Sequence, residues 1–261
     1  MKKVISAAAL ALCLMLVCAL ALGEITVTKK DMVLNRNLDK NVNNILVIMQ
    51  DGELTESMMI ASVNSRTGRS VMTQIACDRV VNLPEAGDVT LGEVYMLGAQ
   101  KSRGLLAART LNSLLDLNIS TYVALDLGML PELVDEIGML STWLNEEEAE
   151  ILGTWAGDNS LSSENILDYV RIDLKEDYVE KNRSYMVFMD LLKQGLRSSG
   201  GANLMGLGKK LLSGMDTNLN AMAAVTMLSS FQGGSDRREL YLYSDMDMQA
   251  MHDAFYAEVY E

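Results

Sequence analysis

The chain has 261 residues, nearly half of them apolar, so it is long enough to bury the core of one ordinary domain. Acidic residues outnumber basic ones by 35 to 22, and the resulting formal charge of −13 disfavours binding to a phosphate backbone. With no basic stripe interleaved with aromatic residues to reverse that balance, we expect no nucleic-acid partner.

The N-terminus has the features of an export signal. Two lysines follow the initiating methionine, and an uncharged apolar run then extends from Val4 to Leu22. Small residues at positions 21 and 23 permit cleavage before Glu24, although the run is also just long enough to be retained as a membrane anchor. We therefore expect residues 1–23 to be a signal peptide or membrane anchor. The body of the protein is then secreted or held at the extracellular face of the cytoplasmic membrane.

The cysteines agree with this location. Cys13 and Cys18 lie in the targeting segment, which leaves Cys77 alone in the rest of the chain. A single cysteine cannot form an internal disulfide, and this pattern is more typical of a bacterial envelope protein than of a disulfide-rich secreted domain.

A pair of strands follows a spacer that we assign to residues 24–43. Apolar runs at 45–49 and 58–63 are typical of buried strands, and the loop between them contains Asp51, Glu53 and Glu56. Carboxylates at a shared end of two strands favour a metal or acid–base site. The same pattern also fits a hairpin whose acidic loop is simply solvated, and the residues alone leave both interpretations open.

The remaining elements alternate between strands and helices, which predicts an α/β sandwich with helices packed on a sheet. The acidic run at 146–148 is expected to be a solvated face. The further predicted strands lie at 70–76 (continued at 80–83), 121–127 and 240–243. One long helical pattern lies within 91–117, and another helix has its start signal at 160–163. The remaining predicted helices lie at 130–137, 177–196, 204–212 and 219–231.

Several of these segments carry sequence motifs in a characteristic order. Residues 44–51, NILVIMQD, are similar to a strand motif N-I-L-L-L-G-x-D, and residues 55–64 keep the frame of the following R-S-D-T-x-x-x-x-S-V-N. Residues 75–78 resemble I-P-R-D, residues 167–173 resemble A-x-Y-V-R-x-R, and residues 179–185 resemble G-R-x-x-R-Q-Q. Together these motifs resemble the LytR-CpsA-Psr family of envelope proteins over residues 44–243, with 244–261 left as a C-terminal tail.

This resemblance implies a fold and a function. The fold is an α/β/α sandwich with a central mixed sheet and an apolar slot for a lipid tail. The function is that of a phosphotransferase at the outer face of the cytoplasmic membrane of a Gram-positive cell. Such proteins take a glycopolymer from a polyprenyl-pyrophosphate carrier and attach it to peptidoglycan. Their chemistry uses carboxylates that hold Mg²⁺ against the pyrophosphate, and arginines that bind its oxygens bidentately.

Carried over residue by residue, the resemblance assigns Asp51 and Glu56 to Mg²⁺ binding and catalysis, with Arg171 as the third catalytic residue. The residues that it assigns to substrate binding are Asp78, Arg79 and Arg183.

The chain departs from the family pattern in ways that remove positive charge. Leu54, Cys77, Asp173 and Glu180 stand where arginines are expected. Each lost bidentate partner of a pyrophosphate costs about 1.5–3 kcal/mol of binding free energy. The alternative is therefore a catalytically degenerate module that binds a lipid or a partner protein. A role in transcription regulation is disfavoured by the export signal and by the acidic balance.

Overall fold

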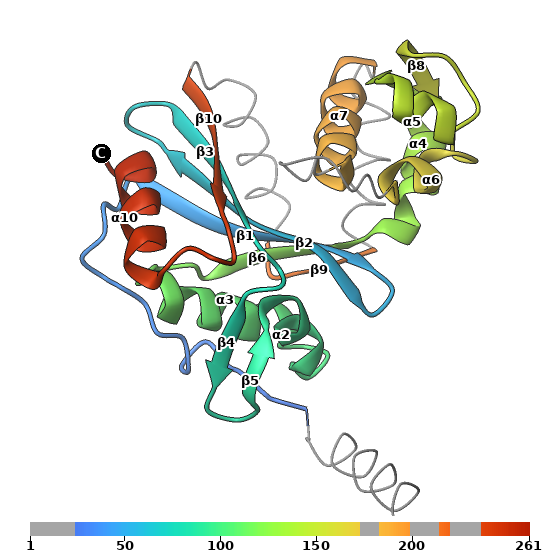
Figure 1. The fold of residues 1–261 in the computed structure, drawn as a ribbon. Helices are drawn as coiled ribbons and strands as arrows, with labels where there is room; N and C mark the ends of the chain where they lie inside the picture. Colours follow the sequence, from blue (N-terminus) through green and yellow to red (C-terminus); the bar gives the residue numbers. More distant parts are fainter. Residues whose placement is uncertain (1–23, 173–182, 199–213, 220–235) are drawn as a thin grey trace, which may run out of the picture.

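The computed structural model describes residues 24–172, 183–198, 214–219 and 236–261. Its centre is a six-stranded sheet with the strand order β10-β3-β2-β1-β6-β9 (Figure 1). β1 is parallel to β6 and β3 is parallel to β10, while the other neighbours are antiparallel, so the sheet is mixed. Its strands are β1 (Val42–Asp51), β2 (Leu54–Asn64), β3 (Arg69–Ile75), β6 (Thr121–Asp126), β9 (Met215–Thr217) and β10 (Asp236–Leu242).

Helices cover both faces of this sheet, which confirms the predicted α/β/α sandwich with a central mixed sheet (Figure 1). The core of one face is built with α2 (Leu91–Leu97), α3 (Arg103–Leu115) and α10 (Met248–Val259), beside a hairpin of β4 (Val80–Leu83) and β5 (Gly87–Thr90). The core of the other face is built with α4 (Leu130–Ile137), α5 (Glu146–Ile151), α6 (Ile166–Val170), α7 (Arg183–Ser198) and a second hairpin of β7 (Leu140–Leu144) and β8 (Gly157–Leu161). The predicted apolar slot for a lipid stays a prediction.

The central strands are apolar on both sides because both faces of the sheet are covered. Leu46 and Ile48 of β1 point into one core, and Val47 and Met49 point into the other. β1 and β2 are joined by a two-residue loop that begins with Gly52, whose φ of +63° would strain any residue with a Cβ atom. This tight turn fixes the position of Asp51 at the end of β1.

The long helical pattern predicted within 91–117 forms two helices instead of one. α2 starts at a capping box made by Thr90 and Glu93, and it ends at Gly98, which approaches α3 too closely for a side chain. α3 then lies against β6 so closely that a Cβ atom on Gly104 would come within 2.0 Å of the Tyr122 ring. The break therefore lets each helix pack separately against the sheet.

Other boundaries also differ from the predictions. Residues 80–83 pair with β5 and do not extend β3, because Pro84 and Gly87 return the chain as a hairpin. The helix predicted to start within 160–163 begins only at Ile166, since β8 continues to Leu161 and Asn165 is the residue that precedes α6. The segment predicted as a tail, 244–261, contains α10, whose apolar side is buried in the core.

Some predictions fall outside the described residues. These are the targeting segment 1–23, the helix at 204–212, and most of the helix at 219–231. Of the amphipathic helix predicted at 177–196, the described part is α7, which begins at Arg183. Within the described ranges, no helix has the length and apolar character needed to cross a bilayer.

Two buried tyrosines attach the edge strand β9 to the rest of the fold. The hydroxyl of Tyr95 donates to Asp216 Oδ2 at 2.9 Å, and that of Tyr122 donates to Asp216 Oδ1 at 3.0 Å. Burial, together with the nearby Asp216 carboxylate, raises the pKa of both hydroxyls well above the usual value for tyrosine. Both rings therefore stay neutral in the fold at pH values where exposed tyrosines ionise.

This arrangement predicts a loss of stability at alkaline pH. In the unfolded chain Tyr95 and Tyr122 ionise near pH 10, whereas in the folded protein they keep their protons, so the free energy of unfolding falls as pH rises above about 10. Urea unfolding between about pH 8 and pH 11 measures this slope. The double variant Y95F/Y122F should be less stable at neutral pH and show a shallower slope. An unchanged slope would contradict the role of these two groups.

Candidate functional site at the carboxyl edge of the sheet

Five of the six predicted site residues, all except Arg183, lie at one edge of the central sheet. β1 and β6 run parallel and end at Asp51 and Asp126, and the antiparallel β2 begins at the same edge. β3 also ends there, so the turn that contains Asp78 and Arg79 lies at this edge. Ligand sites commonly form at the carboxyl ends of strands in open α/β sheets.

Asp51 and Arg171 form a bidentate ion pair although 120 residues separate them. Arg171 Nε donates to Asp51 Oδ2 at 2.7 Å, and Arg171 Nη2 donates to Asp51 Oδ1 at 2.7 Å. Arg171 caps the C-terminus of the short helix α6, and its side chain is 48% exposed, against 24% for Asp51. The pair is thus open to a ligand from solvent.

The pair fixes the charge of both groups. Hydrogen bonds from the Arg171 guanidinium hold the pKa of Asp51 below its usual range. The hydrogen bonds to Asp51, with added attraction to Asp168 and Glu56, raise the pKa of Arg171. At neutral pH the site therefore presents a permanent guanidinium and an ionised carboxylate.

A β-bulge places Glu56 next to this pair. Ser57 pairs with Met49 and Thr55 pairs with Gln50, so Glu56 is the additional residue that β2 contains at the bulge. Its side chain is exposed, and its carboxylate contributes to the raised pKa of Arg171. The structure thus brings Asp51, Glu56 and Arg171 together, and their catalytic role stays a prediction.

Asp51 and Glu56 are also the residues predicted to hold Mg²⁺. In the described part of the chain, no group of three or more acidic, histidine or cysteine side chains forms a preassembled metal cage. Mg²⁺ usually takes only one or two protein carboxylates and completes its shell with phosphate oxygens and water, so this donor set fits an ion that arrives with a pyrophosphate. Each Asp51 oxygen accepts one hydrogen bond from Arg171, so an ion held there would share the carboxylate with the guanidinium.

Asp78 and Arg79 differ from one another in their surroundings. Asp78 is exposed on the turn after β3. Arg79 Nη1 donates to the carbonyl oxygens of Ser244 and Met246, so the guanidinium fastens the loop between β10 and α10. A substrate-binding role for Arg79 would require it to leave these carbonyls, and for both residues that role stays a prediction.

Arg183 lies in a buried ion pair. Its Nε donates to Glu148 Oε1 at 2.9 Å, and its Nη1 donates to the Ile172 carbonyl at 2.9 Å. The side chains of Arg183 and Glu148 are 6% and 0% exposed. The prediction of a wholly solvated acidic run at 146–148 was therefore wrong at Glu148, because the run starts α5 and its third residue turns inward. Substrate binding by Arg183 stays a prediction, and its present contacts are structural.

Further residues at this edge were not singled out in the sequence. Gln50 Nε2 donates to Thr55 Oγ1 at 2.7 Å, and that hydroxyl donates to the Gly92 carbonyl at 2.7 Å. Gly92 N–H in turn donates to the Cys77 carbonyl at 2.8 Å. These bonds fix the start of α2 against the beginning of β2 and against the turn that follows β3. Buried polar residues at the end of an apolar strand were the available signal for this network.

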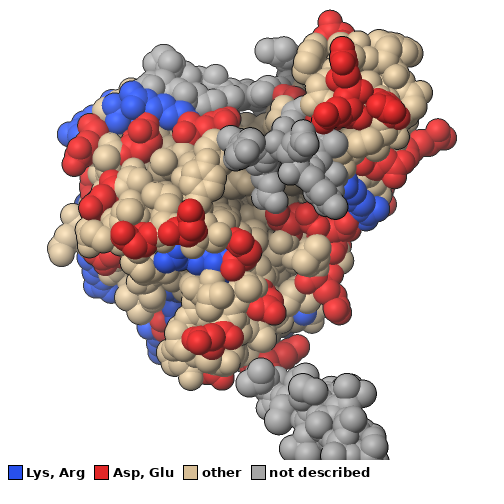
Figure 2. Space-filling view, viewed as in Figure 1, with Lys and Arg blue, Asp and Glu red and all other residues tan. Residues whose placement is uncertain are grey.

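The surface charge makes the few basic residues of the site important. Figure 2 shows acidic side chains spread over the face drawn, with basic side chains in small groups, in line with the formal charge of −13. Leu54, where an arginine was expected, is 63% exposed and provides no charge. Among the arginines of the predicted site, Arg171 is therefore the most exposed.

Comparison with known proteins places these features in context. A model of the LytR_cpsA_psr family matches residues 22–253. The polyisoprenyl-teichoic acid–peptidoglycan teichoic acid transferase TagU of Oceanobacillus iheyensis is 22% identical over an alignment of 208 residues that covers 75% of this chain and 64% of the relative. Biofilm regulatory protein A of Streptococcus mutans is 26% identical over an alignment of 184 residues that covers 63% of this chain and 44% of the relative. The chain thus spans less than two thirds of the length of either relative.

A solved structure has the same fold. The LytR-CPS2A-psr family protein YwtF (TagT) with bound octaprenyl pyrophosphate lipid superposes with a TM-score of 0.67. The match covers 90% of this chain and 99% of that chain, at 14% sequence identity. At this level of identity, the likeness shows the fold alone.

Proposed function

The chain belongs to the LytR-CpsA-Psr family of cell-envelope proteins, and on that premise we propose that it transfers a glycopolymer from a polyprenyl-pyrophosphate carrier to peptidoglycan. The reaction takes place outside the cell, at the surface of the membrane. The observation that carries the proposal is the solvent-accessible pair of Asp51 and Arg171, with Glu56 beside it, at the carboxyl edge of the sheet. The name of the related transferase TagU supports the same substrate class.

The residues of the site have separate tasks in this reaction. An acceptor hydroxyl attacks the phosphorus that carries the polymer, the bond to the polyprenyl phosphate breaks, and the hydroxyl proton passes to a carboxylate of the site. Arg171 exchanges Asp51 for the pyrophosphate and donates two parallel hydrogen bonds to its oxygens. Asp51 and Glu56 would hold Mg²⁺, which neutralises charge that builds up on the leaving phosphate.

A second candidate function is binding without transfer. It is favoured by the contacts of the other predicted arginines, because Arg79 donates to backbone carbonyls and Arg183 is buried against Glu148. With Leu54 and Cys77 at two further arginine positions, the described part of the site has less positive charge than the family pattern predicts. Such a protein would hold the lipid carrier but leave its pyrophosphate intact.

The two functions are separated by one assay on the purified full-length protein in detergent. Octaprenyl pyrophosphate is added with and without Mg²⁺, and both binding and phosphate release are measured, with octaprenol as the control that lacks the pyrophosphate. Transfer chemistry predicts release that requires Mg²⁺ and is lost in D51A. Tight binding without release supports the second function. Equal binding of octaprenol and octaprenyl pyrophosphate, or no binding of either, contradicts both functions.

A further inference from the structure

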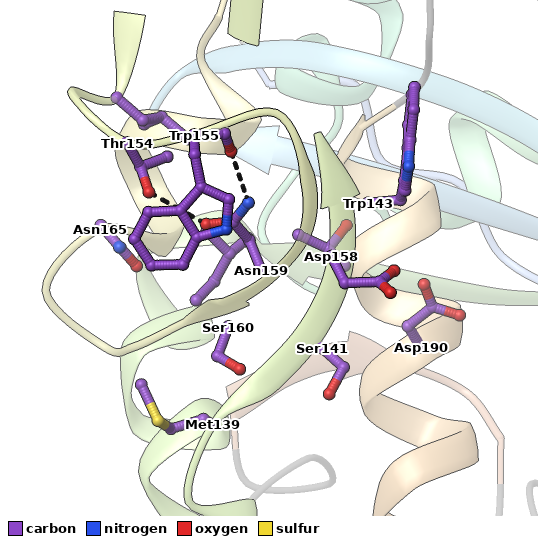
Figure 3. Close-up of a pocket in the computed structure, with 13 residues that line it drawn as sticks. Met139, Ser141, Trp143, Thr154, Trp155, Asp158, Asn159, Ser160, Asn165 and Asp190 are labelled. Atoms are coloured by element: carbon purple, nitrogen blue, oxygen red, sulfur yellow. Dashed lines mark hydrogen bonds between the residues drawn. The ribbon is translucent and has the colours of Figure 1, made fainter. Parts of the chain in front are cut away.

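An open groove lies beside the β7–β8 hairpin, and neither Asp51 nor Arg171 lines it (Figure 3). Its volume is about 830 Å³, which is within the range typical of ligand sites. The walls come from both strands of the hairpin, from the loop that joins α5 to β8, and from Asp190 of α7. Both tryptophans of the chain, Trp143 and Trp155, line it.

The two tryptophans are unusually exposed for their size. Trp143 is 61% exposed, and Trp155, at 70%, is the most exposed large apolar side chain in the described part of the chain. The leucines at both ends of β7 point into the core, so the alternation of the strand turns Trp143 outward. Indole rings kept in water in this way cost free energy unless a ligand covers them, which makes them candidates for a binding platform.

Hydrogen bonds hold the backbone segments that form the walls of the groove. The Asn159 side chain donates to the Trp155 carbonyl at 2.7 Å and accepts from the Thr154 hydroxyl at 3.0 Å, which ties down the loop (Figure 3). On the other side, Gln194 donates to the Met139 carbonyl and accepts from Ser141 N–H when its amide is oriented to satisfy both, at 3.0 and 2.9 Å. This second contact fixes α7 along the open edge of β7.

The charge of the groove restricts what it can bind. Its charged lining residues are Asp158 and Asp190, whose carboxylates point toward one another between the hairpin and α7 (Figure 3). Asp158 lies opposite Trp143 on the hairpin, and its side chain is exposed. The exposed Asp158 carboxylate disfavours a phosphate-rich polymer, and it can accept hydrogen bonds from hydroxyl and amine groups.

We propose that this groove binds an oligosaccharide of neutral or amino sugars, as the acceptor glycan of the reaction. The C–H faces of pyranose rings pack on exposed indoles, while the hydroxyl groups around each ring hydrogen-bond to Asp158, Ser160 and neighbouring polar groups. This inference rests on the proposed function, since it names the second substrate of the transfer. A peptide ligand is the rival occupant that the experiment has to exclude.

The helix α6 connects the groove to the candidate site. Asn165, which lines the groove, precedes α6, and Arg171 caps its other end six residues later, so their backbones are roughly 9 Å apart along the helix axis. The Asn165 end of the groove therefore lies about one short helix away from Arg171, as an acceptor site next to the reacting pyrophosphate would need.

The test uses the N-acetylglucosamine tetramer as the probe and the purified full-length protein. Because the chain contains only two tryptophans and both line the groove, intrinsic tryptophan fluorescence reports on this site alone. We expect a saturable change in fluorescence on addition of the tetramer, and no change on addition of poly(glycerol phosphate). In calorimetry, W143A and W155A should each weaken tetramer binding about tenfold or more.

Two control variants separate glycan binding in the groove from general effects of the substitutions and from the pyrophosphate reaction. V80A removes an apolar side chain of similar exposure on β4, outside the groove, and should leave tetramer binding unchanged. D51A should also bind the tetramer normally, so loss of the pyrophosphate reaction and loss of glycan binding are read separately. The proposal is overturned if the tetramer fails to bind, if both tryptophan variants bind it like the wild type, or if the phosphate polymer binds more tightly. It is also overturned if an unrelated peptide competes as well as the tetramer does.

Discussion

The variant R171A is expected to bind octaprenyl pyrophosphate about 10- to 150-fold more weakly than the wild type. Arg171 offers two parallel N–H donors, now held by Asp51, and a hydrogen bond to a charged group contributes about 1.5–3 kcal/mol. The remaining predicted arginines, Arg79 and Arg183, are already engaged by carbonyl and carboxylate oxygens, so they offer little compensation. Titration of the lipid analogue, followed by calorimetry, measures the change.

The stability of R171A serves as the control for this experiment. The ion pair is solvent-accessible, and such pairs contribute only about 0–1 kcal/mol to folding, so the variant should unfold at nearly the wild-type urea concentration. R171K keeps the charge but loses the planar fork and should show an intermediate affinity. If R171A binds the lipid as well as the wild type does, Arg171 is not a phosphate ligand.

The variant E148A is expected to lose about 3–5 kcal/mol of the free energy of unfolding. Its wholly buried carboxylate accepts from Arg183 Nε at 2.9 Å and from the backbone N–H of Asn145 at 3.0 Å. Removal of one partner leaves the buried guanidinium of Arg183 without that carboxylate, which is the costly case for a buried ion pair. Urea or thermal unfolding, followed by circular dichroism, measures this loss.

Two further variants test the cause of the effect. E147A changes the adjacent exposed residue of the same helix and should shift stability by less than about 0.5 kcal/mol. The double variant E148L/R183M replaces the pair with apolar groups and should recover much of the lost stability. A similar loss for E147A and E148A would show that helix propensity, and not the ion pair, determines the result.

The sequence was most informative where periodicity and local chemistry agree. The apolar runs at 45–49 and 58–63 predict the paired strands β1 and β2, since both faces of a covered sheet must be apolar. The contact between Asp51 and Arg171, by contrast, could not be predicted from local sequence patterns. No local pattern relates residues that are 120 positions apart, so the expectation came from the family motifs, and the fold brings the two side chains together.

Other features depend on tertiary contacts that periodicity does not reveal. An Asn145-x-x-Glu148 capping box could have been read from the sequence, and it would have separated Glu148 from its exposed neighbours. The partner of Arg79 is a pair of backbone carbonyls, which no side-chain pattern predicts. The exposure of Trp143 follows from the direction in which β7 faces the core, so it became clear only with the fold.

The contact between Asp51 and Arg171 has a consequence for selectivity among anions. The carboxylate acts as a tethered competitor, present at high effective concentration, that every incoming anion must displace from the guanidinium. Singly charged ions such as chloride and acetate are poor replacements for a bidentate carboxylate, whereas a diphosphate offers more charge and more oxygens. We therefore expect chloride and acetate to bind more weakly to the wild-type protein than to D51N.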